Sequence, residues 1–258
     1  MRSAEEVEAV RGLAAAGFND CAIARLTGIP RRTVRDLRCR PGRRPRNHGD
    51  PSRGWIEHDF SAVAAEPYAY LLGLYLGDGC ISRRPRAFIL RITLDAKYPP
   101  VIERCRQAID LLMPGQHARI LRRSDGCVDV WLYSKHWPCL LPQHGPGKKH
   151  ERPIRLEPWQ QALIDQATEE FVLGLIHSDG CRVVANDRGV RSIRYHFTNR
   201  SEDILGLFTA ALDKLDIPWT RSSKYIVSIY RKAATARLDE FVGPKAVAVP
   251  LNGVHYTA

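Results

Sequence analysis

The spacing of apolar residues predicts a small helical unit at the start of the chain. Residues 4–16 carry apolar side chains at helical spacing, and a glycine follows where a helix would end. Asn19 or Asp20 can cap a second short helix, Gly28 permits a tight turn, and Pro30 suits the first turn of a third helix. This order predicts a helix-turn-helix.

Farther along, one apolar pattern occurs twice, roughly one hundred residues apart. The two copies are LLGLYLGDGC at 71–80 and VLGLIHSDGC at 172–181. Each is followed by an alternating apolar strand, a helix, and a strand that ends near a tyrosine and a lysine. The matching segments are 88–94 and 191–197 for the strands, 99–112 and 201–215 for the helices, and Tyr133-Ser134-Lys135 and Tyr230-Arg231-Lys232 for the strand ends. An internal duplication explains this pattern, with each copy ordered helix, strand, strand, helix, strand, strand, helix.

Small residues recur at helical spacing in each copy. Gly73 and Gly77 are four residues apart, and so are Gly174 and Ser178. Each predicted helix therefore has a strip with almost no side chain, which another helix can approach closely. We expect the two helices to pack on each other through these strips.

An aspartate followed by a glycine ends each of these helices. If the helices pack together, Asp78 and Asp179 emerge side by side, and the glycines after them can adopt the left-handed cap conformation. Two carboxylates beside the partial negative charge of helix C-termini repel each other, so a cation is expected between them. Hard oxygen ligands open to solvent suit Mg²⁺, and metal ions shared by two acids can support phosphodiester hydrolysis. The alternative is a pair of ordinary core helices that both end in Asp-Gly.

The charge of the chain favours an acidic polymer as its partner. The 258 residues carry a formal net charge of +11 with a pI near 9.5, and neutralising phosphates releases condensed counterions. The third N-terminal helix has an arginine face that we expect to contact DNA, with a solvated face as the alternative. Its residues are Arg31, Arg32, Arg35 and Arg38. The Pro- and Gly-rich stretch that follows, either in a minor groove or as a plain tether, adds Arg43, Arg44 and Arg46.

The cysteine pattern and the lack of a long apolar run exclude two classes of protein. The seven cysteines never form a C-x-x-C pair, so neither a disulfide framework nor a zinc site is predicted, and we interpret them as reduced thiols. No window approaches the roughly 18 to 20 apolar residues of a membrane span. We expect a cytoplasmic protein that has no membrane contact and is associated with the nucleoid through DNA.

The repeated segments resemble the LAGLIDADG motifs of homing endonucleases, in the single-chain form with two motifs. The resemblance covers roughly 66–243. It implies an α+β fold, a pseudo-twofold duplicated αββαββα core with saddle-shaped antiparallel sheets, to which the small all-α helix-turn-helix is added. It also implies that Asp78 and Asp179 are the catalytic, metal-binding acids, and that two or three Mg²⁺ ions are shared between them. The main-chain carbonyls before these acids, those of Gly77 and Ser178, are implied as further metal contacts.

The sequence departs from the family pattern at the first aspartate of each motif. Leu76 and His177 stand there. We interpret His177 as a paired histidine in the interface between the helices, with a metal ligand and a DNA contact as the alternatives.

In this resemblance, the concave sheet faces meet the major groove of DNA. Strand side chains alternate, and this places three basic residues at groove-facing positions, namely Arg91, Arg194 and His196. The connector between the two copies is rich in Gly, Pro and basic residues and lies near phosphate in this hypothesis, which adds Lys148 and Lys149. Lys135 and Lys232 end equivalent strands, and we expect them as accessory catalytic residues that stabilise charge on the cleaved phosphate.

These patterns together predict the domain organisation. We expect a helix-turn-helix at 1–40, a basic linker and lead-in at 41–65, a first LAGLIDADG half at 66–143, a basic connector at 144–165, a second half at 166–245 and a tail at 246–258. The chain is expected to act on double-stranded DNA as a monomer with internal pseudo-twofold symmetry.

Three functions are compatible with this organisation. The first is a sequence-specific endonuclease that makes metal-dependent double-strand cuts by phosphodiester hydrolysis, as in intron homing. The second is a transcriptional regulator that uses a non-cleaving LAGLIDADG scaffold for recognition. The third is an RNA maturase. Because two carboxylates held at helix ends cost stability when no metal is present, the sequence favours the endonuclease.

Overall fold

The computed structural model describes residues 4–39 and 60–245. The chain divides into two compact units, Met1–Glu57 and His58–Ala258. Three predicted DNA contacts, Arg43, Arg44 and Arg46, lie outside the described residues, and so does the tail at 246–258.

The N-terminal unit contains α1 (Ala4–Ala15), α2 (Asp20–Thr27) and α3 (Arg31–Cys39). Asn19 caps α2, as predicted, because its side-chain oxygen accepts hydrogen bonds from the backbone N–H groups of Cys21 and Ala22 at 3.1 and 2.9 Å. Gly28 ends α2 in the left-handed region with φ of 67°. The small core of the unit consists of Val10, Ile23, Ile29 and Val34.

The larger unit contains one order of elements twice, as predicted. The first half consists of α4 (Ala65–Asp78), β1 (Gly79–Arg84), β2 (Ala87–Asp95), α5 (Pro99–Leu112), β3 (Arg119–Arg122), β4 (Cys127–Ser134) and α6 (Trp137–Leu140). The second half consists of α8 (Thr168–Asp179), β5 (Gly180–Asp187), β6 (Val190–Thr198), α9 (Glu202–Lys214), β7 (Thr220–Ser223), β8 (Ile226–Ile229) and α10 (Lys232–Phe241). A 3-10 turn, η1 (Phe60–Ala62), precedes α4, and the connector contains η2 (Lys149–Glu151) and α7 (Pro158–Gln166).

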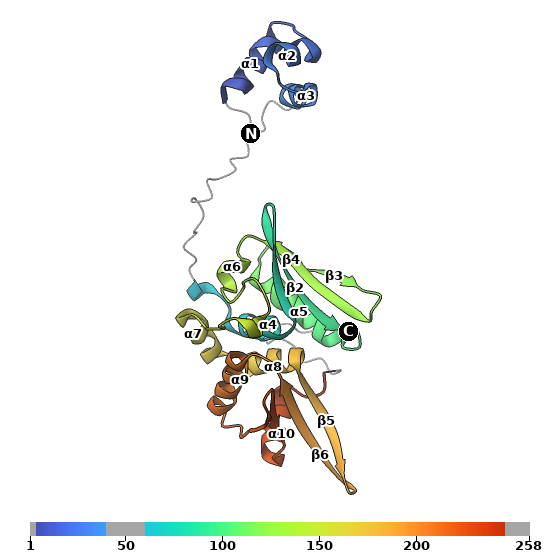
Figure 1. Ribbon diagram of the computed structural model, residues 1–258, viewed down its shortest axis with the longest axis vertical. Coiled ribbons are helices and arrows are strands. Elements are labelled where there is room, and N and C mark those ends of the chain that lie inside the picture. Colours follow the sequence, from blue (N-terminus) through green and yellow to red (C-terminus); the bar gives the residue numbers. More distant parts are fainter. Residues whose placement is uncertain (1–3, 40–59, 246–258) are drawn as a thin grey trace. The chain divides into compact units, whose positions relative to one another are not determined.

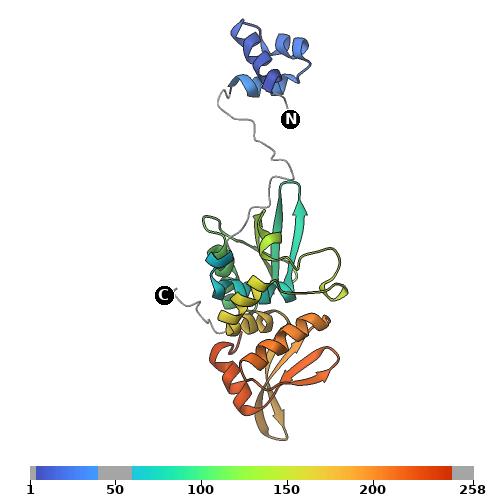
Figure 2. The same cartoon turned by 90° about the vertical axis from the view of Figure 1, so that its left-hand side faces the viewer.

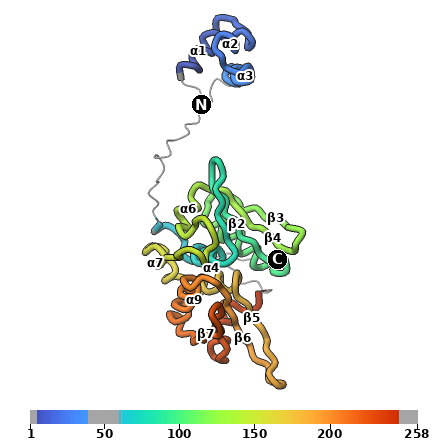
Figure 3. The backbone as a smooth tube through the Cα atoms, in the orientation of Figure 1, coloured from blue at the N-terminus to red at the C-terminus, as the bar shows by residue number. Residues whose placement is uncertain are grey.

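Each half forms one antiparallel four-stranded sheet in the described residues. The strand orders, β1-β2-β4-β3 and β5-β6-β8-β7, are equivalent. Gly79 pairs with Ile92 in the first sheet, and Gly180 pairs with Phe197 in the second, so these pairs mark equivalent positions. The α+β fold class with two duplicated halves is therefore confirmed. Figure 3 shows the long β5–β6 hairpin extending away from the centre of the unit.

The helices α4 and α8 lie side by side between the two halves, and Figures 1 and 2 show this from two directions. Both are buried on nearly all sides, at 67–76 and at 171–177. A methyl group on Gly73 would lie 2.7 Å from the backbone nitrogen of Leu175, and one on Gly174 would overlap the carbonyl oxygen of Tyr70. The predicted close approach through small residues is therefore confirmed, and it brings the two backbones into direct contact.

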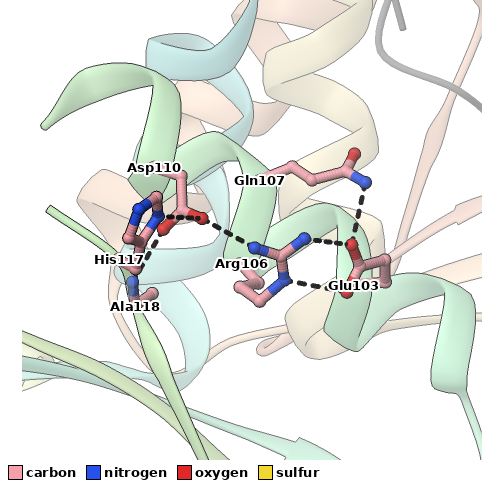
Figure 4. Close-up of polar contacts among 6 residues, drawn as sticks. All are labelled: Glu103, Arg106, Gln107, Asp110, His117 and Ala118. Atoms are coloured by element: carbon pink, nitrogen blue, oxygen red, sulfur yellow. Dashed lines mark hydrogen bonds and ion pairs between the residues drawn. The ribbon is translucent and has the colours of Figure 1, made fainter. Parts of the chain in front are cut away.

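Polar contacts fix α5 on both of its sides. On the solvent side, the Arg106 guanidinium joins Glu103 and Asp110, and Asp110 also accepts a hydrogen bond from the backbone N–H of Ala118 at 2.7 Å (Figure 4). On the inner side, the buried Arg104 donates to both carboxylate oxygens of Glu170 in α8 at 2.6 Å. An ion pair in which one guanidinium nitrogen contacts both carboxylate oxygens thus joins the first half to the helix of the second.

The connector between the two halves packs against the first half. The buried Tyr68 hydroxyl donates to the carbonyl of Leu140 at 2.7 Å and accepts from Gln160 of α7 at 2.6 Å. The helix α7 was not predicted, because the whole of 144–165 reads as a basic linker in the sequence. No helix of the described residues is long and apolar enough to span a membrane, and the cysteines whose side chains are described are all free thiols.

Candidate active site

The two acids of the repeat lie together at the ends of the paired helices. Asp78 is the last residue of α4, and Asp179 is the last residue of α8. A methyl group on Gly77 would lie 2.9 Å from Oδ2 of Asp179, so the end of α4 touches the acid of α8. The predicted juxtaposition of the two carboxylates is therefore confirmed.

The glycines that follow the acids are not left-handed, which corrects the sequence-based expectation. Gly79 has φ of −91° and Gly180 has φ of −103°, both in the extended region. A methyl group on Gly79 would lie 2.6 Å from Cα of Tyr75, and one on Gly180 would lie 2.7 Å from Cα of Ile176. Glycine is needed here because each strand leaves its helix through a space too small for a side chain.

Burial and mutual repulsion disfavour ionisation of the acid pair. Burial, followed by the charge of Asp179, raises the pKa of Asp78 to about 6. Burial also raises the pKa of Asp179, although a hydrogen bond from Asn199 and the charges of two lysines oppose this shift. The site therefore stores an unfavourable negative charge that a nearby cation relieves.

The Lys149 ammonium is one such cation. Its Nζ donates to the carbonyl oxygens of Gly77 at 3.0 Å and Gly79 at 2.6 Å, on either side of Asp78. It also lies 4.9 Å from the ring centre of Tyr75. Burial lowers the pKa of Lys149 to about 8, and the two acids oppose that shift. Lys149 was predicted as a DNA contact in the connector, and the structure places its ammonium inside the acid site.

Lys245 has a related position in the second half. Its Nζ donates to the carbonyl oxygen of His177 at 2.9 Å. Burial lowers the pKa of Lys245, and Asp78 and Asp179 are among the charges that oppose this shift. Lys245 is not among the functional residues predicted from the sequence.

A short motif in the sequence marks both of these lysines. Each follows, at the second position, a glycine in the left-handed region: Gly147 with φ of 75° before Lys149, and Gly243 with φ of 58° before Lys245. This repeated G-x-K pattern comes after the last strand of each half and could have indicated the pair. It is too short to stand out before the structure brings the two lysines to one site.

The strand register locates the two predicted accessory lysines relative to the acids. Lys135 follows Ser134, which pairs with Phe88 near the tip of the β1–β2 hairpin, whereas Gly79 beside the acid pairs with Ile92. Lys232 begins α10, three residues beyond Ile229, and Ile229 pairs with Tyr195, which lies two residues before Phe197, the partner of Gly180. Neither lysine is among the charges that shift the pKa of Asp78 or Asp179, and their accessory role stays a prediction.

An amide holds one acid and not the other. Nδ2 of Asn199 donates to Oδ2 of Asp179 at 2.7 Å, while its Oδ1 accepts from the backbone N–H of Ser201 at 2.8 Å. Counted from the paired residues Phe197 and Ile92, the equivalent position in the first half is Leu94, which is 4% exposed in the core. The carboxylates thus have different partners in otherwise equivalent halves.

A cavity of about 540 Å³ opens at Asp179. Residues of the α4 end, the connector and the end of β6 line it. Polar lining residues include Lys149, Arg152, Asp179, Asn199 and Arg200. The basic side chains of this lining could bind a phosphate, and its aspartate could bind a cation that accompanies the phosphate.

His177 belongs to the interface between the helices. Its Nδ1 lies 2.9 Å from the hydroxyl of Tyr70, and the two rings meet edge to face at 5.7 Å. Burial lowers its pKa to about 3, so the ring is neutral. The interpretation of His177 as a paired interface histidine is confirmed.

The sheet face of the first half carries a network of arginine and aromatic side chains. Arg91 lies 3.7 Å from the Asp129 carboxylate, which also accepts a hydrogen bond from Thr93 at 2.8 Å. Arg119 lies over the ring of Trp131 at 5.5 Å. The alternate residues Val128, Val130 and Leu132 are buried in the core, as the sequence predicted.

The equivalent face of the second half has smaller polar groups. Nδ1 of His196 lies 2.8 Å from the hydroxyl of Ser228, and Arg194 forms an ion pair with Asp187. In the N-terminal unit, Arg31, Arg32 and Arg35 are exposed on α3, whereas Arg38 forms an ion pair with Asp20 of α2. Lys148 is 71% exposed and lies near Glu151. The DNA contacts assigned to these residues stay predictions.

The oxygen atoms available at the acid site are of the kind that bind a divalent cation. Within the described parts of the chain, no three His, Cys, Asp or Glu side chains gather as a metal-binding group. A metal here would therefore use two carboxylates, main-chain carbonyls, water and substrate, which is the ligand set of Mg²⁺. The Lys149 ammonium on the Gly77 carbonyl shows that this point attracts a cation.

The solved structures that are similar to this chain include LAGLIDADG homing endonucleases, at low sequence identity. A structure of I-DmoI in complex with DNA and Mn is 15% identical with a TM-score of 0.46, covering 70% of this chain and 97% of that one. The homing endonuclease I-WcaI bound to its DNA recognition sequence is 13% identical with a TM-score of 0.46, covering 78% and 92%.

A third solved structure is the N-terminal LAGLIDADG domain of DUF199/WhiA. It is 15% identical with a TM-score of 0.45, covering 70% of this chain and 83% of that one. No family model matches the chain, and no curated protein matches it either. At such identities and TM-scores, the chemistry of the site must be judged on its own geometry.

Proposed function

We propose that the chain is a sequence-specific, Mg²⁺-dependent DNA endonuclease that makes double-strand cuts, with each of its two acids helping to cut one strand. The observation that carries this proposal is the pairing of Asp78 and Asp179 across α4 and α8, beside a positively lined cavity. The net charge of +11 supports nucleic acid as the substrate. The groove-facing sheet residues would supply recognition.

The residues of the chain divide the chemical work. Asp78 and Asp179, with the carbonyls of Gly77 and Ser178, would hold the metal. A divalent ion held there would activate a water and would stabilise the departing 3′ oxygen. The ammonium groups of Lys149 and Lys245 lie near the acids and would stabilise negative charge that develops on the phosphate.

A DNA-binding regulator without cleavage is the second candidate, and one observation favours it. Lys149 and Lys245 already relieve the repulsion between the acids, so the carboxylates do not need a metal in order to persist. This weakens the expectation, drawn from the sequence, that a regulator would lose them. The exposed arginines of α3 also suit anchoring to DNA.

Selection of bound and cleaved sites from random duplex DNA distinguishes the two candidates. The full chain is incubated with the pool in Ca²⁺ to recover bound sites, and in Mg²⁺ or Mn²⁺ to recover cut ends. The endonuclease proposal expects one sequence to be enriched in both sets, and Asp78→Asn to remove only the cut ends. Enrichment of bound sites without any cut ends in either metal would favour the regulator.

A further inference from the structure

The two lysines of the acid site contact different carbonyls. Lys149 reaches Gly77, the residue directly before Asp78, whereas Lys245 reaches His177, which lies two residues before Asp179. The lysines are otherwise alike, since both follow a left-handed glycine and both are attracted by the same two acids. Only Lys149 therefore occupies a carbonyl adjacent to an acid.

The Gly77 carbonyl is one of the orphan acceptors at the end of a helix. The last carbonyls of an α-helix have no N–H partner within the helix, and their partial negative charge attracts cations. Gly77 also lies against Asp179, where a side chain would collide with that carboxylate. This carbonyl and the two carboxylates thus form a compact set of hard oxygen atoms, which a divalent ion prefers.

The Lys149 ammonium has the contacts that a bound metal cation would have. Two carbonyl oxygens lie at 3.0 and 2.6 Å from its Nζ, and the Tyr75 ring lies at 4.9 Å. A divalent ion on the Gly77 carbonyl would compete for the same lone pairs and would be repelled by the ammonium. The cavity of about 540 Å³ that Lys149 lines offers space into which the side chain can withdraw.

We propose that the Lys149 ammonium is the resident cation of the metal-free acid pair, and that a divalent ion must displace it from the Gly77 carbonyl in order to bind. Lys245 contributes charge to the site but does not block a ligand. This inference rests on the proposed function, since it assumes a divalent ion at the acids. It makes metal loading and the release of Lys149 one coupled step.

Calorimetric titration of the full, metal-free chain with Ca²⁺ tests this proposal. The variants are Lys149→Met and Lys245→Met. Each replaces the lysine by an apolar side chain of similar length and removes one positive charge near the same acids. Displacement predicts that Lys149→Met binds Ca²⁺ about tenfold or more tightly than the wild type, while Lys245→Met gains only a few-fold, roughly, from the loss of charge. Thermal unfolding establishes that each variant is folded.

Equal gains in the two variants would overturn the proposal, because the lysines would then act through charge alone. A ¹⁵N spectrum of the lysine side chains gives a second readout that does not depend on a variant's fold. The Lys149 ammonium signal should shift on addition of Ca²⁺, and an unchanged signal at saturating Ca²⁺ would also overturn the proposal. Ca²⁺ binding that survives Asp78→Asn unchanged would instead refute the metal site of the proposed function.

Discussion

The two halves of the larger unit share their architecture and differ in what surrounds their acids. The strand order, the helix that ends in Asp-Gly and the following G-x-K lysine occur in both halves. In the second half, Asn199 holds the carboxylate of Asp179, whereas the equivalent residue of the first half is Leu94 in the core. The lysines likewise differ in the carbonyl that each one binds.

This difference shows which features of a duplicated fold are constrained by packing and which can differ between the halves. The helix pair has to stay intact, because two backbones are in contact along small residues and no larger side chain fits. The groups that orient each acid lie on strand ends and connectors, where a substitution does not disturb that contact. Equivalent acids can therefore acquire different partners and unequal roles.

The largest expected effect tests whether the acids, despite their different partners, are both essential. Asp78→Asn and Asp179→Asn should each reduce cleavage about 1000-fold or more, because each removes a charged ligand of a shared ion. Binding of DNA in Ca²⁺-free buffer should change little. Strand-specific cleavage of an end-labelled target duplex measures both strands at once, and loss of only one strand in each variant would show independent sites.

The helix contact, which is common to both halves, should be the next most sensitive feature. Gly174→Ala places a methyl group on the carbonyl oxygen of Tyr70 and should lower the free energy of unfolding by about 2–3 kcal/mol. Gly206→Ala in α9 is the matched control, because nothing lies within 4 Å of its new methyl group. That variant should gain about 0.5–1 kcal/mol in denaturant unfolding. Similar losses at both positions would contradict the close contact.

The pH dependence of metal binding tests the environment of the first acid. Because the pKa of Asp78 is raised to about 6, this carboxyl carries a proton below pH 6 and cannot bind a metal as an anion. Ca²⁺ affinity should fall about tenfold per pH unit below 6. Near pH 8 it should rise, because Lys149, whose pKa is about 8, begins to lose the charge that competes with the ion. Calorimetry across pH 5–8 measures this, and a fall that begins only near pH 4 would show an ordinary, solvated carboxyl.

The smallest effect tests the asymmetry itself. Asn199→Leu gives the second half the residue type of the first and removes the hydrogen bond that lowers the pKa of Asp179. The pKa of Asp179, followed by NMR of the labelled carboxyl carbon, should rise, and cleavage should fall several-fold, roughly. Thr198→Ala, at the exposed neighbour on β6, is the control for a change at the strand end. An unchanged pKa would mean that Asn199 only supports the turn to Ser201.

Much of the fold could be predicted from the sequence, because the duplication constrains it. The alternation of apolar residues gave β2 and β6 to within a residue, and the pairing of the helices followed from Gly73 and Gly174. The connector helix α7 was not predicted, since its basic and proline-rich surroundings are typical of a linker. Burial against Tyr68 fixes it, and that contact is not visible in the sequence.

The acids of the site could be predicted, and its lysines could not. Asp78 and Asp179 lie inside the repeated motif, so a contact between two helices was enough to place them. Lys135 and Lys232 occupy equivalent strand ends, but neither is among the charges that shift the pKa of the two acids. Lys149 and Lys245 reach the acids from segments outside the strands, where sequence spacing says little about distance in space.

The central claim is that Asp78 and Asp179 together bind a divalent ion. A crystal of the chain with its selected DNA duplex, soaked in Mn²⁺ and recorded at the manganese absorption edge, tests it most directly. The account predicts an anomalous peak within coordination distance, about 2.2 Å, of a carboxylate oxygen from each acid. A peak that contacts neither acid, or no peak at the acids at saturating Mn²⁺, would contradict it.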